Sequence, residues 1–119
     1  MAHVIALVGD LLFGSNLQGA LAAAGHDVEL CADEDRARAL APNADVLVVD
    51  LVSDGLDGAR LIESMKLGDE LAECRTLGFY AHIDAEVRAR ALAAGFDMVV
   101  PRSRMARAGA DLVTELVAR

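Results

Sequence analysis

A chain of 119 residues is long enough to bury one core, and a hydrophobic share of 55% excludes a disordered tail. The net charge of −8 disfavours direct binding to nucleic acid, whose phosphates would be repelled, and only 3% of the residues are aromatic and could stack on bases. Cys31 and Cys74 stand far apart without a CxxC spacing, so we expect reduced thiols and a cytoplasmic protein. We expect no signal peptide or membrane anchor, because there is no basic leader and no apolar run of spanning length.

Short apolar segments alternate with helical patterns along the chain. Strands are predicted at residues 4–8, 27–32, 45–51, 77–80 and 97–100, and helices at about 13–24, 33–40, 57–67, 85–94 and 106–119. The first strand is continuously apolar, which is typical of a parallel strand covered on both faces, and the third is the most apolar strand and is expected to be central. The second strand is less apolar and is expected near an edge, and residues 101–103 are expected to form a loop. The alternation predicts one α/β domain over residues 1–119, with a five-stranded parallel sheet in the order 2-1-3-4-5.

In open parallel sheets the functional site lies beyond the carboxyl ends of the strands. Asp10 and Asp50 lie at the ends of the first and third strands, which are neighbours in this order, so both should face one crevice. Two carboxylates close together favour a cation between them, and oxygen ligands suit Mg²⁺. A carboxylate on a rigid strand can accept a phosphoryl group when a metal neutralises the charge. The alternative is that both acids are solvated loop residues.

Two segments resemble those of the response regulator receiver domains. Residues 50–58, DLVSDGLDG, are similar to the signature in which the phospho-acceptor Asp is followed by Leu and later by Asp-Gly, with Ser53-Asp54 in place of Met-Pro. Residues 95–103, GFDMVVPRS, are similar to the segment that runs into Lys-Pro, with Ser103 in place of the Pro. The resemblance covers essentially the whole chain and implies a flavodoxin-like, doubly wound (βα)₅ fold.

The resemblance also implies roles for single residues. Asp50 falls on the phospho-acceptor, Asp10 on an acid that holds Mg²⁺, and the Val52 carbonyl on a further metal ligand. Tyr80 falls on a small hydroxyl residue that contacts the phosphoryl group, and Arg102 falls on the Lys that pairs with it.

Several positions depart from the family pattern. Gly9 replaces the first metal-binding acid, so any Mg²⁺ should bind weakly, and Val99 replaces the aromatic switch residue. Tyr80 is too large for the inward shift of a small hydroxyl, and we expect its ring at the mouth of the crevice, where it would crowd a phosphate on Asp50. Arg102 keeps a positive charge but differs from Lys in shape and reach. These departures resemble atypical receivers, or pseudo-receivers, which keep the fold for protein contacts.

Three functions are compatible with the sequence. The first is a stand-alone receiver-like signalling module, chemotaxis-regulator-like in its single domain, which has a degenerate phosphorylation site, acts by regulated protein–protein binding and is not an enzyme. Its partner would be a sensor histidine kinase or a downstream effector in a bacterial two-component or phosphorelay pathway. The second is a phosphorylatable response regulator that accepts its phosphoryl group on Asp50. The third is a small-molecule-binding protein of flavodoxin-like fold, which the missing phosphate-binding loop disfavours. With no DNA-binding segment in the chain, we expect the output to pass through another protein.

Two surface features complete the prediction. Leu11-Leu12-Phe13 follows Asp10 and is expected to pack in the core, with a cap over the crevice or a contact surface as the alternatives. Arg102, Arg104 and Arg107 form a basic cluster that faces either solvent or an acidic partner. Receivers commonly pair through the fourth helix, fifth strand and fifth helix, so a homodimer through these elements is possible on the resemblance.

Overall fold

The computed structural model describes residues 1–53, 55–81 and 84–119, and Asp54 of the predicted signature lies outside this part. The elements in chain order are β1 (His3–Leu7), α1 (Leu11–Ala23), β2 (Asp27–Cys31), α2 (Glu34–Leu40), a 3₁₀ turn (Ala41–Asn43), β3 (Val46–Asp50), α3 (Gly58–Leu67), β4 (Arg75–Tyr80), α4 (Ala85–Ala94), β5 (Met98–Pro101) and α5 (Arg102–Ala118). Within the described residues, no helix has both the length and the apolar character needed to cross a membrane.

The strands form one five-stranded parallel sheet in the order β2-β1-β3-β4-β5, which confirms the predicted fold class and topology. β3 is the central strand and all of its residues are buried, because helices cover it on both faces. β2 lies at an edge and is only partly buried, as its mixed composition predicted.

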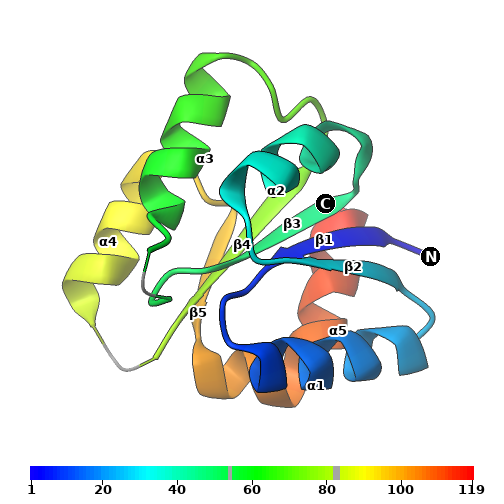
Figure 1. The fold of residues 1–119 in the computed structure, drawn as a ribbon. Helices are drawn as coiled ribbons and strands as arrows, with labels where there is room; N and C mark the ends of the chain where they lie inside the picture. Colours follow the sequence, from blue (N-terminus) through cyan, green and yellow to red (C-terminus); the bar gives the residue numbers. More distant parts are fainter. Residues whose placement is uncertain (54, 82–83) are drawn as a thin grey trace.

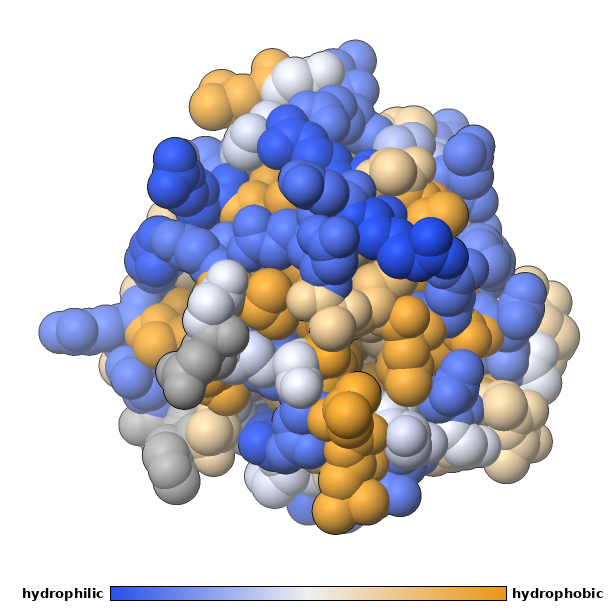
Figure 2. Space-filling view, viewed as in Figure 1, coloured by the Kyte–Doolittle hydropathy of each residue, from blue (hydrophilic) through white to orange (hydrophobic). Residues whose placement is uncertain are grey.

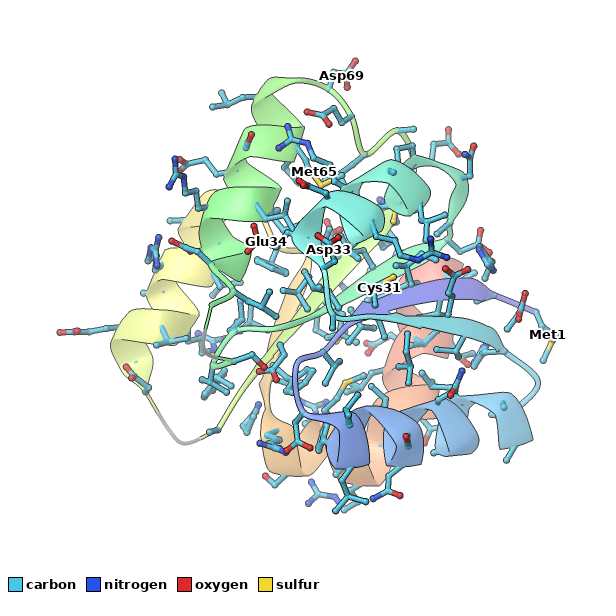
Figure 3. The ribbon with its side chains drawn as sticks, in the orientation of Figure 1. Met1, Cys31, Asp33, Glu34, Met65 and Asp69 are labelled. Carbon is cyan, nitrogen blue, oxygen red and sulfur yellow. The ribbon has the colours of Figure 1, made fainter. Side chains whose placement is uncertain are left out.

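The helices divide between the two faces of the sheet (Figure 1). α1 and α5 cover one face, where Val48, Phe79 and Met105 belong to a buried apolar cluster. α2, α3 and α4 cover the other face, where Cys31 of β2 and Met65 of α3, both labelled in Figure 3, belong to a second cluster. Cys31 and Cys74 are buried free thiols, as predicted.

β4 begins two residues earlier than the apolar pattern indicated. Thr76 is fully buried, and its hydroxyl accepts a hydrogen bond from the Asp97 N–H (3.0 Å) and donates one to the Asp97 carboxylate (3.2 Å). The Thr76 N–H donates to the same carboxylate oxygen (2.8 Å). The paired side chain of Asp97 therefore allows a polar residue inside the sheet, which a search for apolar runs does not detect.

The prediction of a loop at residues 101–103 was wrong, because α5 begins at Arg102. Pro101 has extended dihedral angles (φ −63°, ψ 149°) and precedes the helix as its N-cap residue. The helix kinks at Ala108 (φ −132°, ψ 18°). Next to the kink, a side chain on Gly109 would place its Cβ 3.1 Å from Leu17 Cδ1, so glycine allows α5 to pack closely on α1. Arg102 thus lies in a short helical segment instead of a loop.

Candidate functional site

Asp50 is the last residue of β3 and is buried, with 1% of its surface exposed. The Val52 N–H donates a hydrogen bond to Asp50 Oδ1 (3.0 Å), and the Ser53 hydroxyl donates one to Asp50 Oδ2. Both oxygens of the buried carboxylate are therefore satisfied by the loop that follows the strand. This local pairing explains how the site tolerates a buried acid.

The Ser53 side chain also joins this loop to the end of β1. The Gly9 N–H donates a hydrogen bond to Ser53 Oγ (3.2 Å), so the hydroxyl bridges Gly9 and Asp50. A Cβ on Gly9 would lie 2.8 Å from Ser53 Oγ and 3.0 Å from Ser53 Cβ. Ser53 thus occupies the space into which a side chain at position 9 would project.

Asp10 is the N-cap residue of α1, and its side chain is engaged on both oxygens. Oδ1 accepts a hydrogen bond from the Phe13 N–H (3.0 Å), and Oδ2 accepts one from Arg102 Nη2 (2.6 Å). The Phe13 N–H, and then the Arg102 guanidinium, hold the pKa of Asp10 below its ordinary value.

Arg102 is held by an aromatic ring as well as by the carboxylate. Its guanidinium carbon lies 4.3 Å from the centroid of the Phe13 ring, within the range of a cation–π contact. The Phe13 ring packs in turn against Phe79 of β4, with the centroids 4.9 Å apart. Among the described residues Arg102 pairs with Asp10, whereas Asp50 bonds to Val52 and Ser53. The two predicted site residues Arg102 and Asp50 are therefore not paired with each other.

Tyr80 does not lie at the mouth of the crevice, and that expectation was wrong. Its side chain belongs to the buried cluster under α3 and α4, together with Val99, and only 5% of the residue is exposed. The reason is the alternation of the strand: Phe79 faces the α1–α5 cluster, so the next residue faces the opposite side. The ring therefore fills core space on the face that also holds Val99.

The described side chains do not fit a Mg²⁺ site as they stand. Each oxygen of Asp10 and Asp50 already accepts a hydrogen bond, and the Arg102 guanidinium supplies the positive charge beside Asp10. No cluster of three or more acidic, His or Cys side chains suited to a metal exists among the residues that the structure describes. Of the predicted ligands Asp10, Asp50 and Val52, Asp10 is thus neutralised by Arg102 and Asp50 is held by neutral donors, and their role in binding a metal stays a prediction.

Sequence reasoning missed the two residues that organise this site. Ser53 was noticed only as a departure from Met-Pro, and Phe13 was assigned to the core. One signal was available for Ser53: a glycine replaces an acid at position 9 while a small polar residue appears in the facing loop. No comparable signal pointed to the contact between Arg102 and Phe13, because it depends on the helical start of α5.

No family profile and no curated protein sequence matches the chain. Its fold is nevertheless similar to many solved structures. The receiver domain of the Francisella response regulator 1452 is 20% identical, with a TM-score of 0.87 and coverage of 100% of this chain and 98% of that one. The signal receiver domain of NarL from Mycobacterium tuberculosis is 20% identical (TM-score 0.84, coverage 98% and 96%). A CheY-like receiver domain protein from Methanospirillum hungatei JF-1 is 17% identical (TM-score 0.83, coverage 99% and 94%). The chain therefore has the fold of response regulator receiver domains, as its motifs implied.

Proposed function

We propose that this chain is a receiver-like signalling module that acts by binding a partner protein, and that its phosphorylation site is degenerate. The observation that carries the proposal is a pair of exposed leucines beside the site. Leu11 and Leu12 form the start of α1 directly after Asp10, and 76% and 73% of their surfaces are exposed. The expectation that they pack in the core was wrong.

These leucines lie where the fold places its functional site. Figure 2 shows an apolar column over the beginning of α1, at the bottom of the view. Val52, two residues after Asp50, is also 39% exposed, so exposed apolar side chains lie close in sequence to both carboxylates. Exposed large apolar side chains gathered at one place are typical of protein–protein contacts. A binding role therefore agrees with the surface better than a role in turnover does.

The partner class follows from the resemblance and from charge. We propose a sensor histidine kinase or a downstream effector protein, since the net charge of −8 disfavours nucleic acid. We also propose that the chain is not an enzyme, that it works in the cytoplasm and that any binding of Mg²⁺ is weak. We also propose that two copies pair through α4, β5 and α5, which sedimentation at several concentrations would test.

A phosphorylatable response regulator is the second candidate, and the position of Asp50 favours it. The residue closes the central strand, as the phospho-acceptor does in the receiver family, and its carboxylate is hydrogen-bonded by the next loop. Amide NMR spectra with and without beryllofluoride and Mg²⁺ separate the two functions. A degenerate site predicts no shifts or shifts confined to residues near Asp50, whereas large shifts reaching β5 and α5 would establish a working switch.

The binding role has its own test. The variant Leu11→Ser/Leu12→Ser should keep the stability of the fold, because both side chains are exposed, and should lose a partner that the unmutated chain captures by crosslinking. Leu67→Ser is the matched control, since Leu67 is 84% exposed at the far end of α3. Equal capture by all three proteins would contradict a contact surface at the start of α1.

A further inference from the structure

The missing acid at position 9 and the serine at position 53 form one structural unit. Gly9 is not needed for its backbone freedom, because its φ lies outside the left-handed region. What excludes a side chain there is Ser53, whose Oγ would lie 2.8 Å from an added Cβ. The glycine and the serine are therefore complementary, and an acid at position 9 would require the Ser53 side chain to shift.

The serine hydroxyl connects two parts of the site. It accepts the hydrogen bond from the Gly9 N–H and donates its own proton to Asp50 Oδ2, while Val52 N–H holds Oδ1. The carboxylate is thus fixed at both oxygens, on one side by its own loop and on the other by a bridge to β1. A hydroxyl can do this because it is donor and acceptor at once.

The charges at the site also disfavour a divalent cation. Arg102 neutralises Asp10 through a 2.6 Å contact, so Asp50 is the one carboxylate of the described site that lacks a cationic partner. A site with fewer free carboxylates binds a divalent cation less tightly, because affinity depends on the number of charged oxygen ligands. A neutral hydroxyl in place of an acid lowers that number further.

We propose that Ser53 is a positioning residue that replaces the missing acid: its hydroxyl bridges Gly9 and Asp50 and holds the Asp50 carboxylate in one orientation without a divalent cation. The inference deepens the proposed function, on which it rests for the degenerate character of the site. It predicts that the loss of metal binding resides in the pair of positions 9 and 53 and not in position 9 alone.

A double-mutant cycle tests this coupling. Four proteins are titrated with Mg²⁺ at constant ionic strength while amide NMR shifts are followed: the unmutated chain, Gly9→Asp, Ser53→Gly and Gly9→Asp/Ser53→Gly. We expect the double variant to bind Mg²⁺ at least about tenfold more tightly than either single variant, since only there can the new carboxylate enter the space beside Asp50. Gly9→Asp alone binding as tightly as the double variant would overturn the proposal.

A second measurement does not depend on the folding of the double variant. Ser53→Ala removes the hydroxyl, and Ser53→Thr keeps it. The amide resonance of Gly9 should move in Ser53→Ala and stay near its place in Ser53→Thr, because the hydrogen bond at its N–H is lost only in the first. Equal movement in both variants would show that the hydroxyl is not the bridge.

The outcomes separate this inference from the proposed function. If the unmutated chain already binds Mg²⁺ and beryllofluoride with shifts that spread to α5, the degenerate site is wrong. If the unmutated chain stays inert and the double variant gains no affinity, the proposed function stands and the role assigned to Ser53 fails.

Discussion

Tyr80→Thr should destabilise the fold strongly, although it restores the residue size that receivers have at this position. The ring is 5% exposed and packs in the cluster that also contains Phe96 and Val99. Replacing a buried aromatic residue by alanine costs about 3–5 kcal/mol. Threonine keeps a methyl group but brings a hydroxyl into apolar surroundings, so we expect a loss of about 3 kcal/mol in the free energy of unfolding. Domains are stable by about 5–15 kcal/mol, so the variant should remain folded at 25 °C.

Urea unfolding followed by circular dichroism measures this loss. With a slope of about 2 kcal/mol per molar urea, the midpoint should fall by about 1.5 M. Tyr80→Phe is the control, because it keeps the ring and should cost less than about 1.5 kcal/mol. A loss below about 1 kcal/mol for Tyr80→Thr would refute the reasoning, since it would mean that the ring does not fill core space.

Tyr80 is larger and Val99 smaller than the residues that receivers have at these two positions, and the same assay can test whether the two side chains share core space. Val99 pairs with Gly78 on the neighbouring strand, and Tyr80 pairs with Pro101, so Val99 and Tyr80 lie diagonally on one face of the sheet. Val99→Tyr alone should overpack the core and cost about 1–3 kcal/mol. In the Tyr80→Thr background the new ring can use the vacated space, so the double variant should be more stable than the sum of the single effects by about 1 kcal/mol. Strictly additive losses would contradict a shared space.

Three further outcomes are expected. Thr76→Val should lower the free energy of unfolding by about 1–3 kcal/mol, because it leaves the Asp97 carboxylate and N–H without their hydroxyl partner. A change near zero in urea unfolding would count against the hydrogen bonds between Thr76 and Asp97. The pKa of Asp10 is lowered in the folded chain, so its carboxylate contributes stability above the ordinary Asp pKa of about 4 and loses that contribution as pH falls through the folded pKa. Asp10→Asn should therefore flatten the dependence of the free energy of unfolding on pH between about pH 5 and 3. An unchanged pH dependence in that range would exclude this contribution. Burial raises the pKa of the Cys74 thiol to about 12, so the folded chain holds this thiol buried and protonated at pH 8. A thiol reagent should then label Cys74 only as fast as the protein opens. Rapid labelling of the folded chain would show that the Cys74 thiol is accessible.

The sheet could be predicted from sequence because its signals are local and repeated. Residues 46–49 form an unbroken apolar run, and in the structure β3 is buried in the centre of the sheet. The helix at residues 85–94 was predicted with the bounds observed, because Asp84 caps its start and Gly95, with φ +113°, ends it in the left-handed conformation. Where a boundary was wrong, as at Thr76, a polar residue was buried by a partner distant in sequence.

The site was harder to predict because its contacts join residues that no sequence pattern connects. Matching to the family placed Arg102 opposite a phosphoryl group on Asp50, yet Arg102-Ser103 stands where the family has Lys-Pro, and α5 begins at Arg102 directly after Pro101. The guanidinium then meets Asp10, ninety-two positions away, over the ring of Phe13. An arginine at this point satisfies a carboxylate that a receiver would offer to a metal. The contact therefore neutralises Asp10 from a helix that begins ninety-two positions later, which no local sequence pattern could indicate.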